Sequence, residues 1–218
     1  MQKENKSFIP ALSFHWLTWV YDPVVHWTTR EDTFKQALIR QANLQNGQKI
    51  LDLGCGTGTL CLKIKKQFPE AEVFALDADE KILRMARKKA AKEKVEIAFE
   101  QGFSDHLPFA DASFERVVST LFFHHLANQS KRQTLREALR ILKPDGELHI
   151  ADFGAPRNAL ERLFSHSVQA LDAVETTKDN LEGQLPLLMS EDGFSEVERG
   201  TYFKTVVGTI RLFKALKK

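Results

Sequence analysis

An apolar run that ends in an acid and three alternating glycines occupies residues 50–60, with the sequence ILDLGCGTGTL. Residues 59–66 then show helical periodicity and a lysine-rich end. This pattern predicts a buried strand that turns sharply into a helix. Because glycine has no Cβ atom, a ligand can approach the backbone closely, and the start of a helix presents free N–H groups to it. The segment therefore predicts a ligand-binding loop at the end of a strand.

A second apolar run, residues 72–77, ends in Asp77. It follows the glycines by about twenty residues, a spacing that places the acid at the tip of the neighbouring strand. A carboxylate at that position can accept both hydroxyl groups of a ribose. The glycine loop and Asp77 together predict a cofactor that carries a nucleoside.

The spacing of the glycines distinguishes between kinds of nucleoside cofactor. Dinucleotide-binding proteins use G-x-G-x-x-G, but Gly54, Gly56 and Gly58 form G-x-G-x-G and Thr59 stands at the dinucleotide position. The chain also has no phosphate-binding G-x-x-x-x-G-K-[ST] run. With Asp52 in front, the string resembles motif I of the class I S-adenosylmethionine-dependent methyltransferases.

The resemblance continues over much of the chain. Residues 99–109 look like the adenine loop of that family, residues 112–119 like its fourth strand, and residues 141–153 like the turn into its fifth strand. The order and the sequences of these motifs are closest to those of the branch that contains the ubiquinone/menaquinone-biosynthesis methyltransferases. The resemblance implies binding of S-adenosyl-L-methionine, with S-adenosyl-L-homocysteine as the product. The implied cofactor contacts are Asp52, Gly54, Cys55, Gly56, Gly58, Asp77, Ala78, Ile82, Gly102, Phe103, Ser104, Thr120 and Leu121.

Two of these positions carry alternatives. Asp52 either orders the glycine loop, contacts the methionine ammonium through water, or takes part in a helix N-cap. Phe103 stands where the branch usually has an acid that receives the adenine amino group, and the nearest acid, Asp105, comes two residues later. We expect Phe103 to pack near the adenine while Asp105 or the backbone receives the amino group, because an aromatic ring beside a purine gains contact area. The alternative is a reduced affinity for the cofactor.

The candidate catalytic pair is His124-His125, in the segment that follows the fourth strand. An imidazole there could deprotonate a phenol or an enol during methyl transfer. The alternative is that one ring packs locally while the other faces solvent. Methyl transfer also gains much of its rate from alignment of the reacting atoms, and needs a base only when the nucleophile arrives protonated.

The N-terminal stretch, residues 8–30, holds all three tryptophans of the chain. Family members often place such a segment over the substrate opening, which implies an aromatic lid for a flat or lipophilic acceptor. The candidate substrate contacts are Trp16, Tyr21 and His26. The alternatives are an amphipathic helix docked on the sheet and, less favoured, peripheral contact with a membrane.

Strands and helices alternate from residue 49 to residue 153, which is typical of an α/β parallel sheet. The predicted strands are 49–53, 72–76, 95–100, 114–119 and 146–152, and the predicted helices are 58–67, 79–92 and 130–142. Residues 196–207 and 209–215 alternate as two further strands around a tight reversal. The resulting fold is a Rossmann-like, seven-stranded, mostly parallel sheet with an antiparallel last strand and helices on both faces.

The length of 218 residues suits a single methyltransferase domain. Its predicted parts are an N-terminal helical lid (1–45), a cofactor-binding core (46–153), a helical insertion (154–190) and a C-terminal β-hairpin (191–218). Cys55 and Cys61 do not have the spacing of a zinc or CxxC redox site, so we expect buried thiols and no metal. No signal peptide or membrane-spanning run is visible, which predicts a cytoplasmic protein.

The net charge of +2 gives no general attraction to nucleic acid. The sequence therefore predicts a monomeric or homodimeric enzyme that methylates an oxygen or a carbon of a small, apolar or aromatic molecule. A non-catalytic protein that binds S-adenosylmethionine to regulate or assist a partner is the main alternative. A nicotinamide-dependent oxidoreductase is a more distant one, because of Thr59 and the terminal hairpin.

Overall fold

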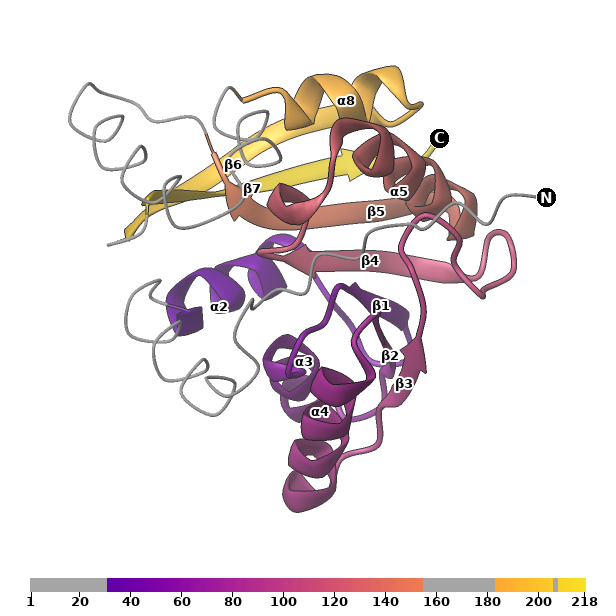
Figure 1. The fold of residues 1–218 in the computed structure, drawn as a ribbon, viewed down its shortest axis with the longest axis vertical. Coiled ribbons are helices and arrows are strands. Elements are labelled where there is room, and N and C mark those ends of the chain that lie inside the picture. The colour runs from indigo at the N-terminus through magenta and orange to yellow at the C-terminus, as the bar shows by residue number, and fades with distance from the viewer. Residues whose placement is uncertain (1–30, 155–182, 206–207) are drawn as a thin grey trace, which may run out of the picture.

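The computed structural model describes residues 31–154, 183–205 and 208–218. Within them, seven strands form one sheet in the order β3-β2-β1-β4-β5-β7-β6 (Figure 1). The strands are β1 (Lys49–Leu53), β2 (Glu72–Asp77), β3 (Ala98–Gln101), β4 (Phe114–Thr120), β5 (Leu142–Phe153), β6 (Ser195–Thr205) and β7 (Gly208–Leu216). The helices are α2 (Glu31–Gln41), α3 (Thr59–Gln67), α4 (Glu80–Glu93), α5 (Asn128–Ile141), α8 (Leu185–Glu191) and the 3-10 helix η2 (Phe123–His125).

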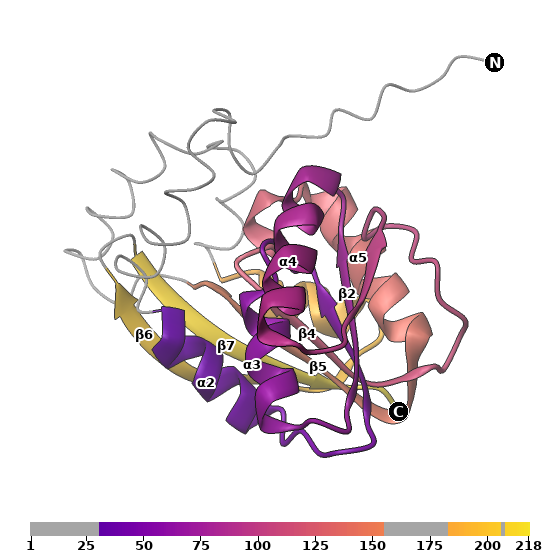
Figure 2. The same cartoon turned by 90° about the horizontal axis from the view of Figure 1, so that it is seen from below.

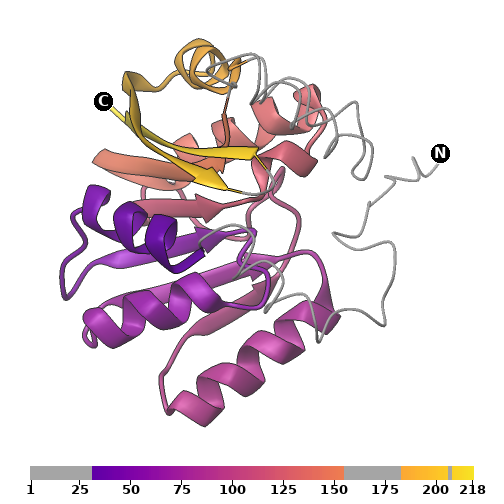
Figure 3. The ribbon, with the colours of Figure 1, turned by 90° about the vertical axis from the view of Figure 1, so that its left-hand side faces the viewer.

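The first five strands are parallel, and β7 is antiparallel to both β5 and β6. Figure 3 shows the yellow β6–β7 pair at one end of the molecule and the magenta helix α4 at the other. This arrangement confirms the predicted mostly parallel sheet with an antiparallel last strand. It also brings the carboxyl ends of β1, β2, β4 and β5 to one edge, where open α/β sheets bind ligands.

Helices cover both faces of the sheet, as predicted. Figure 2 shows α2, α3 and α4 on one side of the strands and α5 on the other. Each face has its own core of buried side chains. One core includes Leu38 of α2, Leu60 of α3 and Leu83 of α4, and the other includes Leu135 of α5 and Leu188 of α8. Burial of apolar area on both faces stabilises the sheet that carries the site.

The predicted starts of the first two helices lie within one residue of the observed ones. Gly58, with φ of 76°, precedes α3, and the Asp79 side chain caps α4 by accepting a hydrogen bond from the Lys81 N–H at 2.8 Å.

The fifth strand begins earlier than predicted, because the predicted turn is part of the strand. β5 begins at Leu142, and the turn residues form an irregularity in its pairing with β4.

The three candidate substrate contacts, Trp16, Tyr21 and His26, lie outside the described residues. So does most of the predicted helical insertion, since residues 155–182 are not described. The described end of the N-terminal segment is α2, which packs on the sheet through Phe34 and Leu38, both fully buried. The division of the chain into a lid, a core, an insertion and a hairpin stays a prediction.

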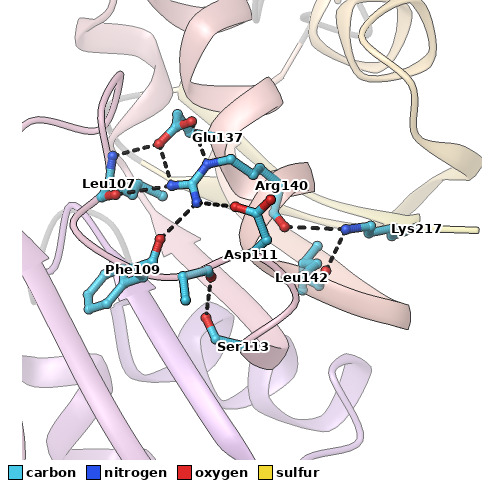
Figure 4. A network of polar contacts seen from close by, with 9 residues as sticks. Leu107, Phe109, Asp111, Ser113, Glu137, Arg140, Leu142 and Lys217 are labelled. Atoms are coloured by element: carbon cyan, nitrogen blue, oxygen red, sulfur yellow. Dashed lines mark hydrogen bonds and ion pairs between the residues drawn. The ribbon is translucent and has the colours of Figure 1, made fainter.

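An arginine on α5 holds the long segment between β3 and β4 (Figure 4). The Arg140 guanidinium donates to the Leu107 and Phe109 carbonyl oxygens at 3.0 and 2.8 Å. It also pairs with Glu137 and Asp111 at 2.8 and 2.7 Å. Glu137 in turn accepts a hydrogen bond from the Leu107 N–H at 2.7 Å. This network ties the segment that begins with the predicted adenine loop to α5.

Replacing Arg140 with methionine is expected to lower the free energy of unfolding by about 1–3 kcal/mol, because two backbone carbonyls and two carboxylates lose a charged donor. Urea unfolding measures the change. Arg136→Met is the matched control, since Arg136 lies one turn earlier on α5, its side chain is 63% exposed, and its partner Asp192 keeps a second arginine, Arg132. Loss of a pair from an exposed arginine costs about 0–1 kcal/mol. Equal losses in the two variants would contradict a special role for Arg140.

Candidate cofactor and active site

Backbone hydrogen bonds draw the predicted cofactor loops together at the carboxyl edge of the sheet. The N–H groups of Gly54 and Cys55 both donate to the Leu76 carbonyl, at 2.9 and 3.0 Å. The Gly102 N–H donates to the Asp77 carbonyl at 3.0 Å. The glycine loop after β1, the acid at the end of β2 and the predicted adenine loop after β3 are therefore neighbours.

The three glycines of the loop all have positive φ, but they differ in what surrounds them. A Cβ atom on Gly54 would lie 2.4 Å from the Phe122 ring, and one on Gly58 would lie 3.1 Å from the Ala86 Cβ. A Cβ atom on Gly56 would meet nothing within 4 Å. Close packing against other protein atoms thus explains why residues 54 and 58 are glycines. Gly56 instead borders open space, through which a ligand can reach the backbone.

Asp77 holds the loop from the neighbouring strand. Its Oδ2 accepts a hydrogen bond from the Gly56 N–H at 2.9 Å, and its Oδ1 accepts one from the Asp79 N–H at 3.0 Å. Burial raises the pKa of this carboxyl, and the backbone donors oppose that rise. A carboxylate oxygen can accept two hydrogen bonds, so each oxygen retains the capacity to accept a ribose hydroxyl.

Asp52 is fully buried beneath the same loop. Its Oδ2 accepts a hydrogen bond from the Cys61 thiol at 2.9 Å, but its Oδ1 has no hydrogen-bond partner within the described residues. Burial raises the pKa of Asp52 to about 6, against the effects of the Cys61 thiol and the Lys35 charge. The N-cap residue of α3 is Gly58, and the Asp52 carboxyl reaches the Cys61 backbone N–H in the first turn of that helix, which opposes the rise of its pKa. A buried oxygen without a donor fits a ligand ammonium.

The raised pKa of Asp52 predicts a pH-dependent stability for the ligand-free protein. The folded carboxyl keeps its proton up to about pH 6, whereas the unfolded carboxyl loses it near its ordinary value of 3.8. The stabilisation is therefore present below the unfolded value and is lost as the pH rises through the folded one. The span of about two pKa units corresponds to about 3 kcal/mol.

Asp52→Asn is expected to remove this loss of stability. Urea unfolding of the ligand-free wild type and variant between about pH 4 and pH 8 measures the difference. The wild type should lose stability relative to the variant as the pH rises. Parallel stability curves for the two proteins would show that Asp52 does not titrate in this range.

The remaining predicted cofactor residues lie along the same edge, each partly or fully buried apart from Phe103. The Phe103 side chain is 51% exposed. Ser104 differs, because its hydroxyl is bonded to the buried Thr134 hydroxyl at 2.7 Å and is directed to α5. A cofactor contact from Ser104 would therefore come from its backbone. The others are Cys55, Ala78, Ile82, Gly102, Thr120 and Leu121.

A buried histidine–aspartate pair lies where β4 and β5 end. The Nδ1 atom of His124 is 2.8 Å from Oδ1 of Asp152, which also accepts the Phe153 N–H at 2.7 Å. Oδ2 of Asp152 accepts the N–H groups of Phe122 and His124 at 3.2 and 3.3 Å. Burial alone would raise the pKa of Asp152, but the His124 ring and these donors lower it. The pair fixes the orientation of the imidazole through Nδ1.

The His125 ring lies beside the His124 ring, with the ring centroids 3.9 Å apart and the planes tilted by 43°. The structure thus brings both predicted histidines together and adds Asp152, which the sequence analysis did not select. A signal for it exists, because Asp152 ends an apolar strand just as Asp52 and Asp77 do. Both cysteines are buried, as predicted, and no cluster of metal-ligating side chains occurs within residues 31–154, 183–205 and 208–218.

Comparison with known proteins agrees with this geometry. Residues 50–146 match a family model described as a methyltransferase domain. A demethylmenaquinone methyltransferase of Deinococcus radiodurans is 28% identical over 84% of this chain and 76% of that protein. A ubiquinone/menaquinone biosynthesis C-methyltransferase of Blochmanniella floridana is 31% identical over 71% of this chain and 62% of that protein. The crystal structure of a SAM-dependent methyltransferase from Aquifex aeolicus superposes with a TM-score of 0.65 at 18% identity, over 84% of this chain and 89% of that one.

The match to the family model identifies residues 50–146 as a methyltransferase domain, and the sheet shares its fold with that S-adenosylmethionine-dependent methyltransferase structure. The chain resembles the demethylmenaquinone and ubiquinone/menaquinone methyltransferases among its relatives, although it spans only about two thirds to three quarters of the lengths of the two compared. Among the helices that the structure describes, each is too short or too polar to cross a bilayer.

Proposed function

We propose that the chain transfers a methyl group from S-adenosylmethionine to a ring carbon of a reduced quinone or a similar flat, apolar phenol. The observation that carries this substrate class is the resemblance over 84% of the chain to a protein named demethylmenaquinone methyltransferase. C-methylation, rather than O-methylation, is favoured by the word C-methyltransferase in the name of the Blochmanniella relative.

The residues at the carboxyl edge fit the cofactor. Asp77 has accepting capacity for the ribose, Gly56 leaves room at the backbone, and Asp52 has an unsatisfied acceptor for the ammonium. When bound, S-adenosylmethionine supplies an electrophilic methyl group. The exposed Phe103 ring would cover the adenine in place of a carboxylate contact, so that its face contributes apolar contact area.

His124 is the candidate general base. Its Nδ1 is engaged with Asp152, which leaves Nε2 to accept the hydroxyl proton of a hydroquinone. Loss of that proton raises the electron density of the ring carbon, which would form a bond to the methyl group as the sulfonium–methyl bond breaks and leaves S-adenosylhomocysteine. The ring carbon then loses its hydrogen as a proton and the quinol oxygen regains one, which restores the aromatic ring. Asp152 stabilises the imidazolium that results, without itself taking the proton. His125, whose ring lies against that of His124, would position the base or the acceptor ring.

A methyl-transfer assay tests the proposal. The protein is incubated with methyl-labelled S-adenosylmethionine and a demethylated menaquinol kept reduced, and the product is analysed by mass spectrometry. Label on a ring carbon is the expected result. Binding of S-adenosylhomocysteine without transfer to the quinol or to a panel of simple phenols would contradict the substrate class and favour the non-catalytic alternative.

A further inference from the structure

A lysine on α2 is buried beside the glycine loop. The side chain of Lys35 is 8% exposed, and its Nζ lies 2.5 Å from Oε1 of Glu31, whose side chain is 10% exposed. Lys35 Nζ also donates to the Thr59 hydroxyl, which itself donates to Glu31 Oε1 at 2.8 Å. Thr59 is the first residue of α3, directly after Gly58. The ammonium group is thus held at the start of the helix that follows the loop.

This ammonium group has fewer acceptors among the described residues than it has donors. A lysine ammonium has three donors, and the described residues accept from Lys35 at Glu31 and Thr59 alone. A charged donor that is buried and unsatisfied costs free energy, so such donors normally have a partner. The third N–H of the Lys35 ammonium is therefore a candidate to donate a hydrogen bond to a ligand.

The buried carboxylate of Asp52 lies by the same helix start. Its Oδ2 accepts the Cys61 thiol at 2.9 Å, and Cys61 comes two residues after Thr59 on α3. Asp52 Oδ1 is buried and has no donor among the described residues. A cation with a spare donor and an anion with a spare acceptor therefore flank one glycine loop. That arrangement complements a zwitterion, which presents a carboxylate and an ammonium on one carbon.

We propose that Lys35 binds the carboxylate of the amino-acid end of the cofactor, opposite the contact of Asp52 with the ammonium. The inference rests on the cofactor assignment and adds a binding residue to it. The free N–H groups at the start of α3 would support the same carboxylate. Glu31 and Thr59 hold the lysine in place, so that its charge is already oriented when the ligand arrives. The competing explanation is that Lys35 and Glu31 form an ion pair with a purely structural role.

Two ligands separate these explanations, namely S-adenosylhomocysteine and its decarboxylated form, which keeps the nucleoside and the ammonium. Calorimetry on the full chain measures the ratio of their affinities. The wild type should bind S-adenosylhomocysteine about 10- to 100-fold more tightly than the decarboxylated ligand. In Lys35→Met the ratio should fall to about one, since only the ligand with a carboxylate loses a contact.

Lys63→Met is the matched control, because Lys63 forms a partly exposed pair with Asp32 at 2.6 Å and should leave the ratio at its wild-type value. If Lys35→Met does not fold, the double variant Lys35→Met with Glu31→Gln removes both charges of the pair and gives the same comparison. A wild-type ratio in either Lys35 variant would overturn the proposal. A wild type that binds neither ligand would instead refute the cofactor assignment on which it rests.

Discussion

Asp77→Ala is expected to weaken binding of S-adenosylhomocysteine by about 100- to 1,000-fold. The variant removes a carboxylate that would accept two ribose hydroxyls, and each such charge-assisted bond contributes about 1.5–3 kcal/mol. It also leaves the Gly56 N–H without its acceptor, which loosens the loop that borders the ligand. Isothermal titration calorimetry at neutral pH measures the change directly.

Asp79→Ala provides the control for this prediction. Asp79 lies two residues later and caps α4, so its loss should reduce stability by about 0.5–2 kcal/mol without removing a ribose contact. Thermal unfolding of both variants separates damage to the fold from damage to the site. Affinities of Asp77→Ala and wild type within a few-fold of each other would mean that the ribose is bound elsewhere.

His124→Gln is expected to lower kcat for a hydroquinone acceptor by about 100- to 10,000-fold, the usual contribution of a general base. KM should change little, because glutamine retains a polar side chain of similar reach. The measurement is steady-state methyl transfer, with His106→Gln as a control at an exposed histidine. A large loss of activity in His125→Gln, with near-normal activity in His124→Gln, would show that His125 and not His124 is the base.

Asp152→Asn distinguishes orientation of the base from a structural role of the pair. Asparagine can still accept the backbone N–H groups of Phe122 and His124, but it carries no charge. Without the carboxylate, Nδ1 of His124 loses the charged partner that orients the ring, so kcat should fall while the affinity for S-adenosylhomocysteine is retained. A parallel loss of kcat, of that affinity and of thermal stability would support a structural role alone.

The parts of the site that the sequence predicted are those whose signals are local. Gly56 and Asp77 each follow an apolar strand directly, so the pattern of one segment is enough to find them. Lys35 and Asp152 are different, because each is connected to the candidate site through contacts with distant segments, at Thr59 and His124. No spacing rule predicts such contacts before the sheet order and the helix packing are known.

The start of the fifth strand also could not be predicted from local signals alone. Pro144 and Gly146 are correct turn signals, and Asp145 does adopt a positive φ of 62°. However, the Asp145 N–H donates to the Lys217 carbonyl and the Lys217 N–H donates to the Gly146 carbonyl, each at 2.9 Å. Backbone pairing with the end of the chain therefore continues the strand through the turn, and that partner lies far away in the sequence.

Titration of S-adenosylhomocysteine into the full chain tests the central claim most directly. The account predicts one binding site per chain with an affinity in the micromolar range, and no competition from NADH or NADPH. An absence of binding, or displacement of the ligand by a pyrophosphate-containing dinucleotide, would contradict the claim that the glycine loop and Asp77 form an adenosyl-sulfur site.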